Sequence, residues 1–243
     1  MMARPIQLGV MLLLLLSGCT PLSEDIARRD ELPASREEVK QPAIPESGSR
    51  QNLDASTQRT IKRYGPTIRR YADMYGFDWR LVLAVMKQES RFRHRAESRK
   101  GAAGLMQIMP VTGEEVARRL DLDDLSHPEN NIHGGIFYLK RLYEFFYQSG
   151  EADRLKLTLA AYNAGISRIY DAQEMAAYLH EQPTKWSAVK DALPLLSKRF
   201  YTLHRSVWPQ EKPRAGWFGN SGETIRYVAA VMNYYDEYRA MLN

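Results

Sequence analysis

Helical periodicity runs through nearly the whole sequence after residue 53, and it constrains the fold more than any other feature. Apolar residues recur at three- and four-residue spacing, and no sustained stretch alternates apolar and polar residues as a half-buried strand does. We therefore expect an all-α domain over residues 54–243. Its predicted helices cover 57–75, a segment after the cap Asp78, 112–120, 128–146, 152–162, 166–179, 185–196 and 222–242.

The helix after Asp78 carries one acid on an otherwise apolar face. Val82, Val85 and Met86 precede Glu89 at the i, i+3, i+4, i+7 spacing of a buried stripe. A carboxyl that is removed from water and has no adjacent cation keeps its proton to higher pH, which is the state that a general acid needs near neutrality. Glu89 is thus a candidate catalytic acid. The alternative is that Glu89 ends the helix at a solvated edge, as glutamate usually does.

A glycine-rich apolar segment, GAAGLMQIMP, follows from Gly101 to Pro110. Its glycines allow the backbone to approach a ligand closely, and Gln107 places a two-way hydrogen-bonding amide among apolar neighbours. The segment could bind a polar ligand. It could equally be a core loop in which Gln107 satisfies backbone groups and the methionines fill gaps.

Four motifs in this order resemble those of the lytic transglycosylases with the soluble-lytic-transglycosylase, goose-lysozyme-like fold, which cleave the glycan strands of peptidoglycan. They are ES at Glu89 with Ser98 nine residues later, GAxGLMQIMP, AYNAG at 161–165 and ETxxYVxxV at 223–231. Four motifs in a fixed order are far more specific than one short pattern. The resemblance implies a lysozyme-like helical domain with the Glu89 helix in the middle. Residues 166–222 resemble the membrane-bound lytic transglycosylase F subgroup, whose solute-binding-like module we do not expect here.

The resemblance also implies a mechanism with one catalytic acid. Glu89 would protonate the glycosidic oxygen between N-acetylmuramic acid and N-acetylglucosamine. It would then accept the proton of the muramoyl 6-hydroxyl, which closes a 1,6-anhydro ring without consuming water. Ile225 stands where the family commonly has arginine, which puts that local contact in doubt. The substrate-binding residues implied are Ser98, Gln107, Met109, Tyr162, Asn163, Glu223 and Tyr227.

Two other functional classes remain open at this stage. A lysozyme-type muramidase hydrolase would need a second acid to activate water, and Asp121, Asp123 and Asp124 are available, although we expect them to be solvated caps. A non-catalytic murein-binding scaffold would keep the cleft but would not need Glu89. Trp208, Trp217 and Phe218 could extend the cleft by stacking on sugar faces, but we expect them to pack in the core. We also expect Tyr234, Tyr235 and Tyr238 to pack rather than to bind.

The beginning of the chain resembles a bacterial lipoprotein signal. Arg4, the apolar run 10–16 and the LSGC sequence ending at Cys19 supply the charged, apolar and small-residue regions of an export signal. We expect residues 1–18 to be removed and Cys19, the only cysteine, to carry acyl chains such as palmitate. Thr20 favours the outer membrane within that family, facing the periplasm. Residues 19–53, rich in proline and charge, predict a disordered tether.

Composition narrows the choice of partners. The formal net charge of +5 suits an anionic polymer, and nucleic acid is not expected for an exported protein. The five histidines show no spacing typical of metal ligands, so we expect neither a metal nor another cofactor. The expected partners are peptidoglycan glycan strands and the outer membrane, and we expect a monomer.

Overall fold

The computed structural model describes residues 53–242, and these residues confirm the all-α prediction. The part of the chain that it describes contains no named strand, and two isolated bridges join Glu97 to Ala103 and Ala103 to Ile108. The predicted signal, Cys19 and the tether up to residue 52 lie outside the described residues. The helices are α1 Ala55–Tyr75, α2 Trp79–Ser90, α3 Pro110–Leu120, α4 Pro128–Phe145, α5 Glu151–Ala164, α6 Ile166–Tyr178, α7 Trp186–Ala192, the 3-10 helices η1 Leu193–Leu196 and η2 Lys198–Phe200, α8 Tyr201–Val207 and α9 Ser221–Met241.

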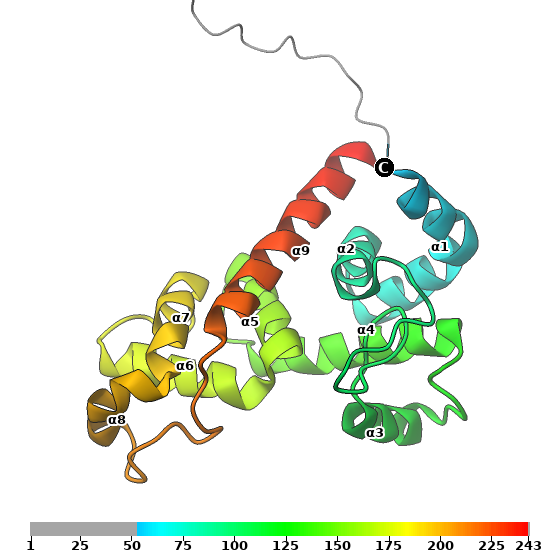
Figure 1. The fold of residues 1–243 in the computed structure, drawn as a ribbon. Helices are drawn as coiled ribbons and strands as arrows, with labels where there is room; N and C mark the ends of the chain where they lie inside the picture. The colour runs from blue at the N-terminus through cyan, green and yellow to red at the C-terminus, as the bar shows by residue number, and fades with distance from the viewer. Residues whose placement is uncertain (1–52, 243) are drawn as a thin grey trace, which may run out of the picture. The chain divides into compact units, whose positions relative to one another are not determined.

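The helices form two groups that α9 connects (Figure 1). Helices α1 to α4 lie on one side. In this group, α4 packs along α1, and α2 also packs against α1. Helices α5 to α8 form the other group, in which α6 contacts both α5 and α7. Helix α9 runs across both groups and packs against α2 and α5. The Glu89 helix therefore lies between α1 and α9, in the middle of the domain as expected.

Helix α2 is more deeply buried than one apolar stripe predicts. Val82, Val85 and Met86 are fully buried as expected, and the intervening Leu83 and Ala84 are fully buried too. A helix that is apolar around its circumference belongs inside a core rather than on its surface. This burial fixes the end of α2, where Glu89 lies.

Local sequence signals account for the starts of α1 and α2. Asp78 caps α2 as predicted, because its Oδ1 accepts a hydrogen bond from the Arg80 backbone nitrogen over 2.9 Å. Asp54, which we did not predict as a cap, starts α1 two residues early by accepting from Ser56 and Thr57. Pro66 lies inside α1, and the helix continues through it.

Gly165 ends α5 and begins α6 at once. Its backbone has φ 87° and ψ 140°, which is outside the left-handed helical region of the common glycine cap and is open essentially to glycine alone. The AYNAG motif therefore makes a sharp corner between two helices rather than a simple helix end.

The predicted helix at 185–196 is shorter than expected. Pro194 has no N–H to donate, and the chain changes there from the α7 helix to the 3-10 helix η1. The sequence prediction missed η2 and α8 entirely. Trp208, just after α8, is 2% exposed and lies in the core as predicted, whereas Trp217 is 45% exposed and the prediction for it was wrong.

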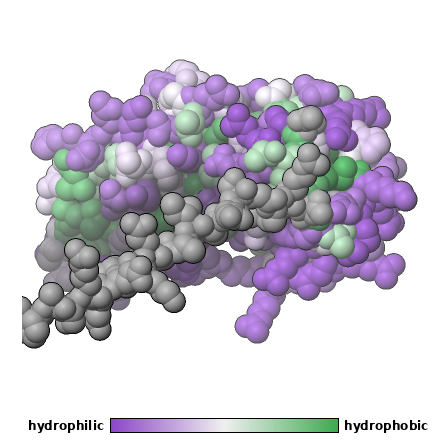
Figure 2. All heavy atoms as spheres, turned by 90° about the horizontal axis from the view of Figure 1, so that it is seen from above, coloured by the Kyte–Doolittle hydropathy of each residue, from purple (hydrophilic) through white to green (hydrophobic). Residues whose placement is uncertain are grey.

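One face of the domain is mainly polar. Figure 2 shows one face on which hydrophilic residues dominate and hydrophobic residues gather in smaller patches. Within residues 53–242, no helix is both long and apolar enough to cross a membrane.

Candidate active site

Glu89 and Tyr227 are in direct contact although 138 positions separate them in the chain. The Tyr227 Oη donates a hydrogen bond to Glu89 Oε1 over 2.6 Å. Glu89 lies in the last turn of α2, and Tyr227 comes from α9, which packs against α2. Tyr227 is buried, whereas Glu89 keeps part of its surface open to solvent. The carboxyl is thus held by protein and remains reachable.

Burial sets the acidity of Glu89. It raises the pKa of this carboxyl to about 7, and the hydrogen bond from Tyr227 opposes part of the rise because it favours the ionised form. None of the ion pairs within the described residues includes Glu89. A carboxyl with this pKa is about half protonated at neutral pH, so it can donate a proton and later accept one.

Tyr162 lies near the same carboxyl and holds the neighbouring loop. Burial raises the pKa of Tyr162 well above its ordinary value, and the charge of Glu89 adds to that rise. The Tyr162 Oη donates to the Met106 backbone oxygen over 2.8 Å. Its phenol thereby ties α5 to the segment between α2 and α3, residues 91–109, which we call the motif loop.

Asn131 is a residue of this region that the sequence analysis missed. Its Oδ1 accepts from the Met106 backbone nitrogen over 2.8 Å, and its Nδ2 donates to the backbone oxygens of Ala103 and Leu125. Asn131 is 1% exposed, on α4. Its position in the first turn of α4 gave no sign of this role, because only the packing of α4 brings Asn131 to the motif loop.

The two polar residues of the motif loop bond to the loop itself. Ser98 Oγ accepts from the Ala102 backbone nitrogen over 3.0 Å. Gln107 Nε2 donates to the Ala96 and Gly104 backbone oxygens over 2.9 and 3.0 Å. Gln107 also has a left-handed backbone, with φ 48°. Both side chains therefore shape the loop, which is the alternative considered for Gln107, and neither is hydrogen-bonded to Glu89.

The remaining predicted residues form no hydrogen bond with the Glu89 carboxyl among the described residues. Asn163 Oδ1 accepts from Thr224 Oγ1 over 2.8 Å, which joins α5 to the start of α9. Glu223, one turn before Tyr227, is exposed and accepts from the Asn220 side chain. Met109 is 41% exposed and precedes α3. The structure thus brings Tyr227 and Tyr162 to Glu89, and it places Glu223 at the exposed start of α9.

No second carboxylate is placed beside Glu89 by the hydrogen bonds and ion pairs of residues 53–242. Asp121, Asp123 and Asp124 are exposed, as expected. Asp121 follows the last turn of α3, and Asp124 closes a turn by accepting from the Ser126 backbone nitrogen over 2.7 Å. The same residues contain no group of three or more histidine, cysteine or acidic side chains that could hold a metal ion.

Aromatic residues of α9 behave as predicted. Tyr238 is buried, and its Oη lies 3.2 Å from Thr57 Oγ1. Tyr235 donates to Asp78, and Tyr234 packs against the core. These three residues hold α9 against α1 and α2 rather than bordering Glu89.

Comparison with known proteins finds similarity to lytic transglycosylases. The transglycosylase SLT domain model matches residues 66–183. The chain is 35% identical over 179 residues to the membrane-bound lytic murein transglycosylase F of Desulfosudis oleivorans, covering 72% of this chain and 36% of that protein. It is 36% identical over 183 residues to the protein of the same name from Stutzerimonas stutzeri, covering 74% of this chain and 34% of that protein. The chain thus spans about a third of the length of these relatives.

Solved structures show the same fold. The lytic transglycosylase Slt of Pseudomonas aeruginosa, solved as an inactive mutant, aligns with a TM-score of 0.54 and 25% identity over 79% of this chain and 27% of that one. The 70-kDa soluble lytic transglycosylase of Escherichia coli aligns with a TM-score of 0.54 and 24% identity over 78% of this chain and 26% of that one. The lysozyme-like helical fold expected from the sequence is confirmed.

Proposed function

Because this chain belongs to the SLT-domain lytic transglycosylases, we propose that it cleaves the β-1,4 bond between N-acetylmuramic acid and N-acetylglucosamine in peptidoglycan and leaves 1,6-anhydro-muramic acid ends. The observation that carries the proposal is the Glu89 carboxyl, buried against Tyr227 with a pKa of about 7. Such a group fits a reaction in which one residue serves first as acid and then as base.

In the proposed reaction Glu89 donates a proton and later accepts one, so that it ends in its starting state. Glu89 in its protonated form donates to the glycosidic oxygen as the bond to the muramoyl C1 breaks. The 2-acetamido group of the muramoyl sugar stabilises the positive charge that develops at C1. The ionised Glu89 then accepts the proton of the 6-hydroxyl while that oxygen bonds to C1. The carboxyl ends protonated, and no water enters the product.

The surroundings of Glu89 favour this course over hydrolysis by two carboxylates. A retaining or inverting glycosidase needs a second carboxylate about 5 to 9.5 Å from the acid. Burial and the Tyr227 hydrogen bond are the causes of the Glu89 pKa, and no neighbouring acid contributes to it. In the proposed site, Tyr227 orients Glu89, Tyr162 holds the motif loop, and Ser98, Gln107, Met109, Asn163 and Glu223 border the sugars.

Product analysis tests the reaction type. Purified murein digested with the full chain should release muropeptides that end in 1,6-anhydro-muramic acid, which are lighter by one water than hydrolytic products in a mass spectrum. Products with mainly reducing ends would show a lysozyme-type hydrolase instead. Binding to murein without any product would show a non-catalytic scaffold.

We also propose that the chain is a lipoprotein of the outer membrane. In this proposal residues 1–18 are a signal, Cys19 is acylated, and residues 19–53 tether a catalytic domain formed by residues 54–243. The relatives named above are membrane-bound proteins, which supports a membrane location in general. Cys19→Ala should move the protein from the membrane fraction to the soluble periplasm and leave its activity on isolated murein unchanged. Recovery of the unaltered protein in the soluble fraction would contradict the anchor.

A further inference from the structure

Basic side chains line two adjoining hollows beside the motif loop. The larger hollow has a volume of about 530 Å³, and Arg63, His94 and Arg95 are among its lining residues. The smaller has a volume of about 360 Å³ and also includes Arg63 and His94. The two hollows share these two lining residues and therefore adjoin each other. We call the pair of hollows the basic groove, and its basic lining residues are Arg59, Arg63, Arg91, Arg93, His94 and Arg95.

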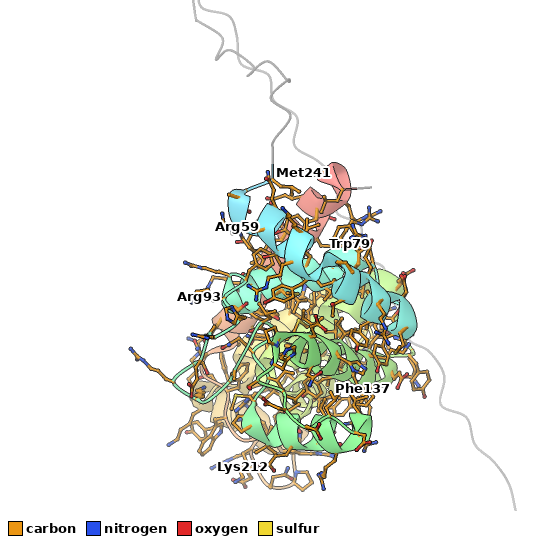
Figure 3. All side chains as sticks on the ribbon, turned by 90° about the vertical axis from the view of Figure 1, so that its right-hand side faces the viewer. Arg59, Trp79, Arg93, Phe137, Lys212 and Met241 are labelled. Atoms are coloured by element: carbon orange, nitrogen blue, oxygen red, sulfur yellow. The ribbon has the colours of Figure 1, made fainter. Side chains whose placement is uncertain are left out.

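The positive charges of the basic groove are not neutralised within the domain. None of its five arginines takes part in an ion pair among residues 53–242. Glu97 and Asp124 also line the larger hollow, so the five arginines of the groove outnumber its two carboxylates. Figure 3 shows Arg59 from α1 and Arg93 from the motif loop projecting outward on the same side of the domain. The groove therefore presents a net positive surface to solvent.

The motif loop joins the basic groove to the candidate active site. Ala96 and Gly104 line the larger hollow, and their backbone oxygens are the two acceptors of the Gln107 side chain. Arg91 lines the smaller hollow and ends the Glu89 helix, with a left-handed backbone at φ 50°. A ligand held in the groove would thus rest on the same loop that a sugar strand at Glu89 contacts.

We propose that the basic groove binds acidic peptide, namely the carboxylate-bearing peptides that project from the glycan strand. This inference rests on the proposed function. Guanidinium groups present planar pairs of N–H donors that match carboxylates. The groove consists of two adjoining hollows, which peptide side chains and carboxylates can enter; a flat lipid surface would contact the rims and leave the hollows unfilled. The peptides would hold peptide-bearing strands at the active site in preference to bare strands.

Arg63 and Arg95 are the residues to change. Arg63 is common to both hollows, Arg95 lines the larger one, and neither forms a hydrogen bond or ion pair within the described residues. The test compares the full chain with the double variant Arg63→Gln/Arg95→Gln. A matched control, Arg118→Gln/Lys212→Gln, removes the same charge from exposed residues that do not line the groove. Circular dichroism melting checks that each variant is folded.

The assay measures kcat and KM on peptide-bearing glycan strands and on strands from which an amidase has removed the peptides. The groove variant should raise KM on peptide-bearing strands roughly two- to thirty-fold, since two exposed ion pairs are lost. Its kcat, and its KM on bare strands, should equal those of the unaltered chain. The control variant should keep the preference, and added salt should weaken it in the unaltered chain.

Each other result overturns the inference. If the unaltered chain cleaves both strands with the same KM, or if both double variants lose the same affinity, the groove does not bind peptide although the proposed function stands. If the groove variant instead loses binding to vesicles of phosphatidylglycerol and keeps its preference among strands, the groove contacts lipid. Failure of the proposed function itself is distinct, because the unaltered chain would then release no product from either strand.

Discussion

The phenol of Tyr227 donates a hydrogen bond to the Glu89 carboxyl, a group that burial holds near the midpoint of its titration at neutral pH. The bond opposes the effect of burial because a phenolic donor stabilises the ionised carboxyl. The pKa of Glu89 therefore depends both on its burial at the end of α2 and on the hydrogen bond from Tyr227 on α9. This balance makes the acidity of Glu89 sensitive to a single hydroxyl.

Tyr227→Phe should shift the pH dependence of cleavage. Removing the hydroxyl removes a contact that lowers the pKa of Glu89, so that pKa should rise above about 7. A protonated Glu89 starts the proposed reaction, and activity is lost as pH rises through its pKa. The midpoint of that decline in kcat/KM should therefore move to higher pH in the variant. Tyr235→Phe is the control, because Tyr235 bonds to Asp78 and not to Glu89; an unmoved midpoint in Tyr227→Phe would disprove the coupling.

Glu89→Gln should abolish turnover and keep substrate binding. Glutamine retains the shape and a hydrogen-bonding capacity of the side chain but cannot donate the proton. General acid–base catalysis contributes typically 10²- to 10⁴-fold, so kcat on purified murein should fall by about that factor. Sedimentation with murein should show unchanged binding. Retained activity, together with loss of activity in a variant of Asp121, Asp123 or Asp124, would contradict the single-acid site.

Glu89→Gln should also be more stable than the unaltered protein at alkaline pH. The pKa of Glu89 is about 7 in the folded protein and 4.5 in its ordinary state, so the folded state binds the proton more tightly. Proton binding by Glu89 therefore stabilises the folded state fully below pH 4.5. This stabilisation is lost as pH rises through 7, because the ionised carboxyl must then stay buried. This difference corresponds to at most roughly 3 kcal/mol.

Urea unfolding at two pH values measures the effect. Glu89→Gln should exceed the unaltered protein in free energy of unfolding at pH 8, and the two should be close at pH 4. An equal difference at both values would show that the substitution acts through packing and not through ionisation.

The sequence predicted the helix and acid of the site because both depend on local pattern. The stripe of Val82, Val85 and Met86 is readable at helical spacing, and it places Glu89 on a buried face. The full burial of α2 was less readable, because Leu83 and Ala84 extend the apolar surface around the helix. Local periodicity shows which side of a helix is apolar, but neighbouring helices decide how much of it is covered.

The partners of the motif residues could not be predicted from spacing alone. The Met106 backbone nitrogen donates to Asn131 on α4, and the Met106 backbone oxygen accepts from Tyr162 on α5. Such contacts depend on how α4 and α5 pack beneath the loop. The position of the segment around Arg214 could not be predicted either, since Asp171 anchors it by accepting from the backbone nitrogens of Arg214 and Ala215. A buried carboxylate on another helix leaves no periodic signal in the segment that it holds.

Two glycines in left-handed backbone separate the effect of conformation from the effect of close packing. Gly104 in the motif loop has φ 82°, and Gly76 after α1 has φ 72°. A Cβ on Gly104 would lie 2.3 Å from the Asn131 side chain, which is fully engaged with the loop. A Cβ on Gly76 would have no heavy atom of another residue within 4 Å. Both alanine variants are strained by roughly 1 to 2 kcal/mol, and only Gly104→Ala also displaces Asn131.

Gly104→Ala should therefore lose more stability than Gly76→Ala and should also impair cleavage. Displacement of Asn131 leaves the buried Met106 nitrogen without its acceptor, which costs about 1 to 3 kcal/mol more. Since Met106 is also the acceptor of Tyr162, the loop should shift relative to Glu89, and kcat on murein should fall even at temperatures where the variant stays folded. Gly76→Ala should keep its kcat. Equal losses of stability and activity in the two variants would show that the left-handed backbone, and not the packing of Asn131 against Gly104, holds the motif loop in place.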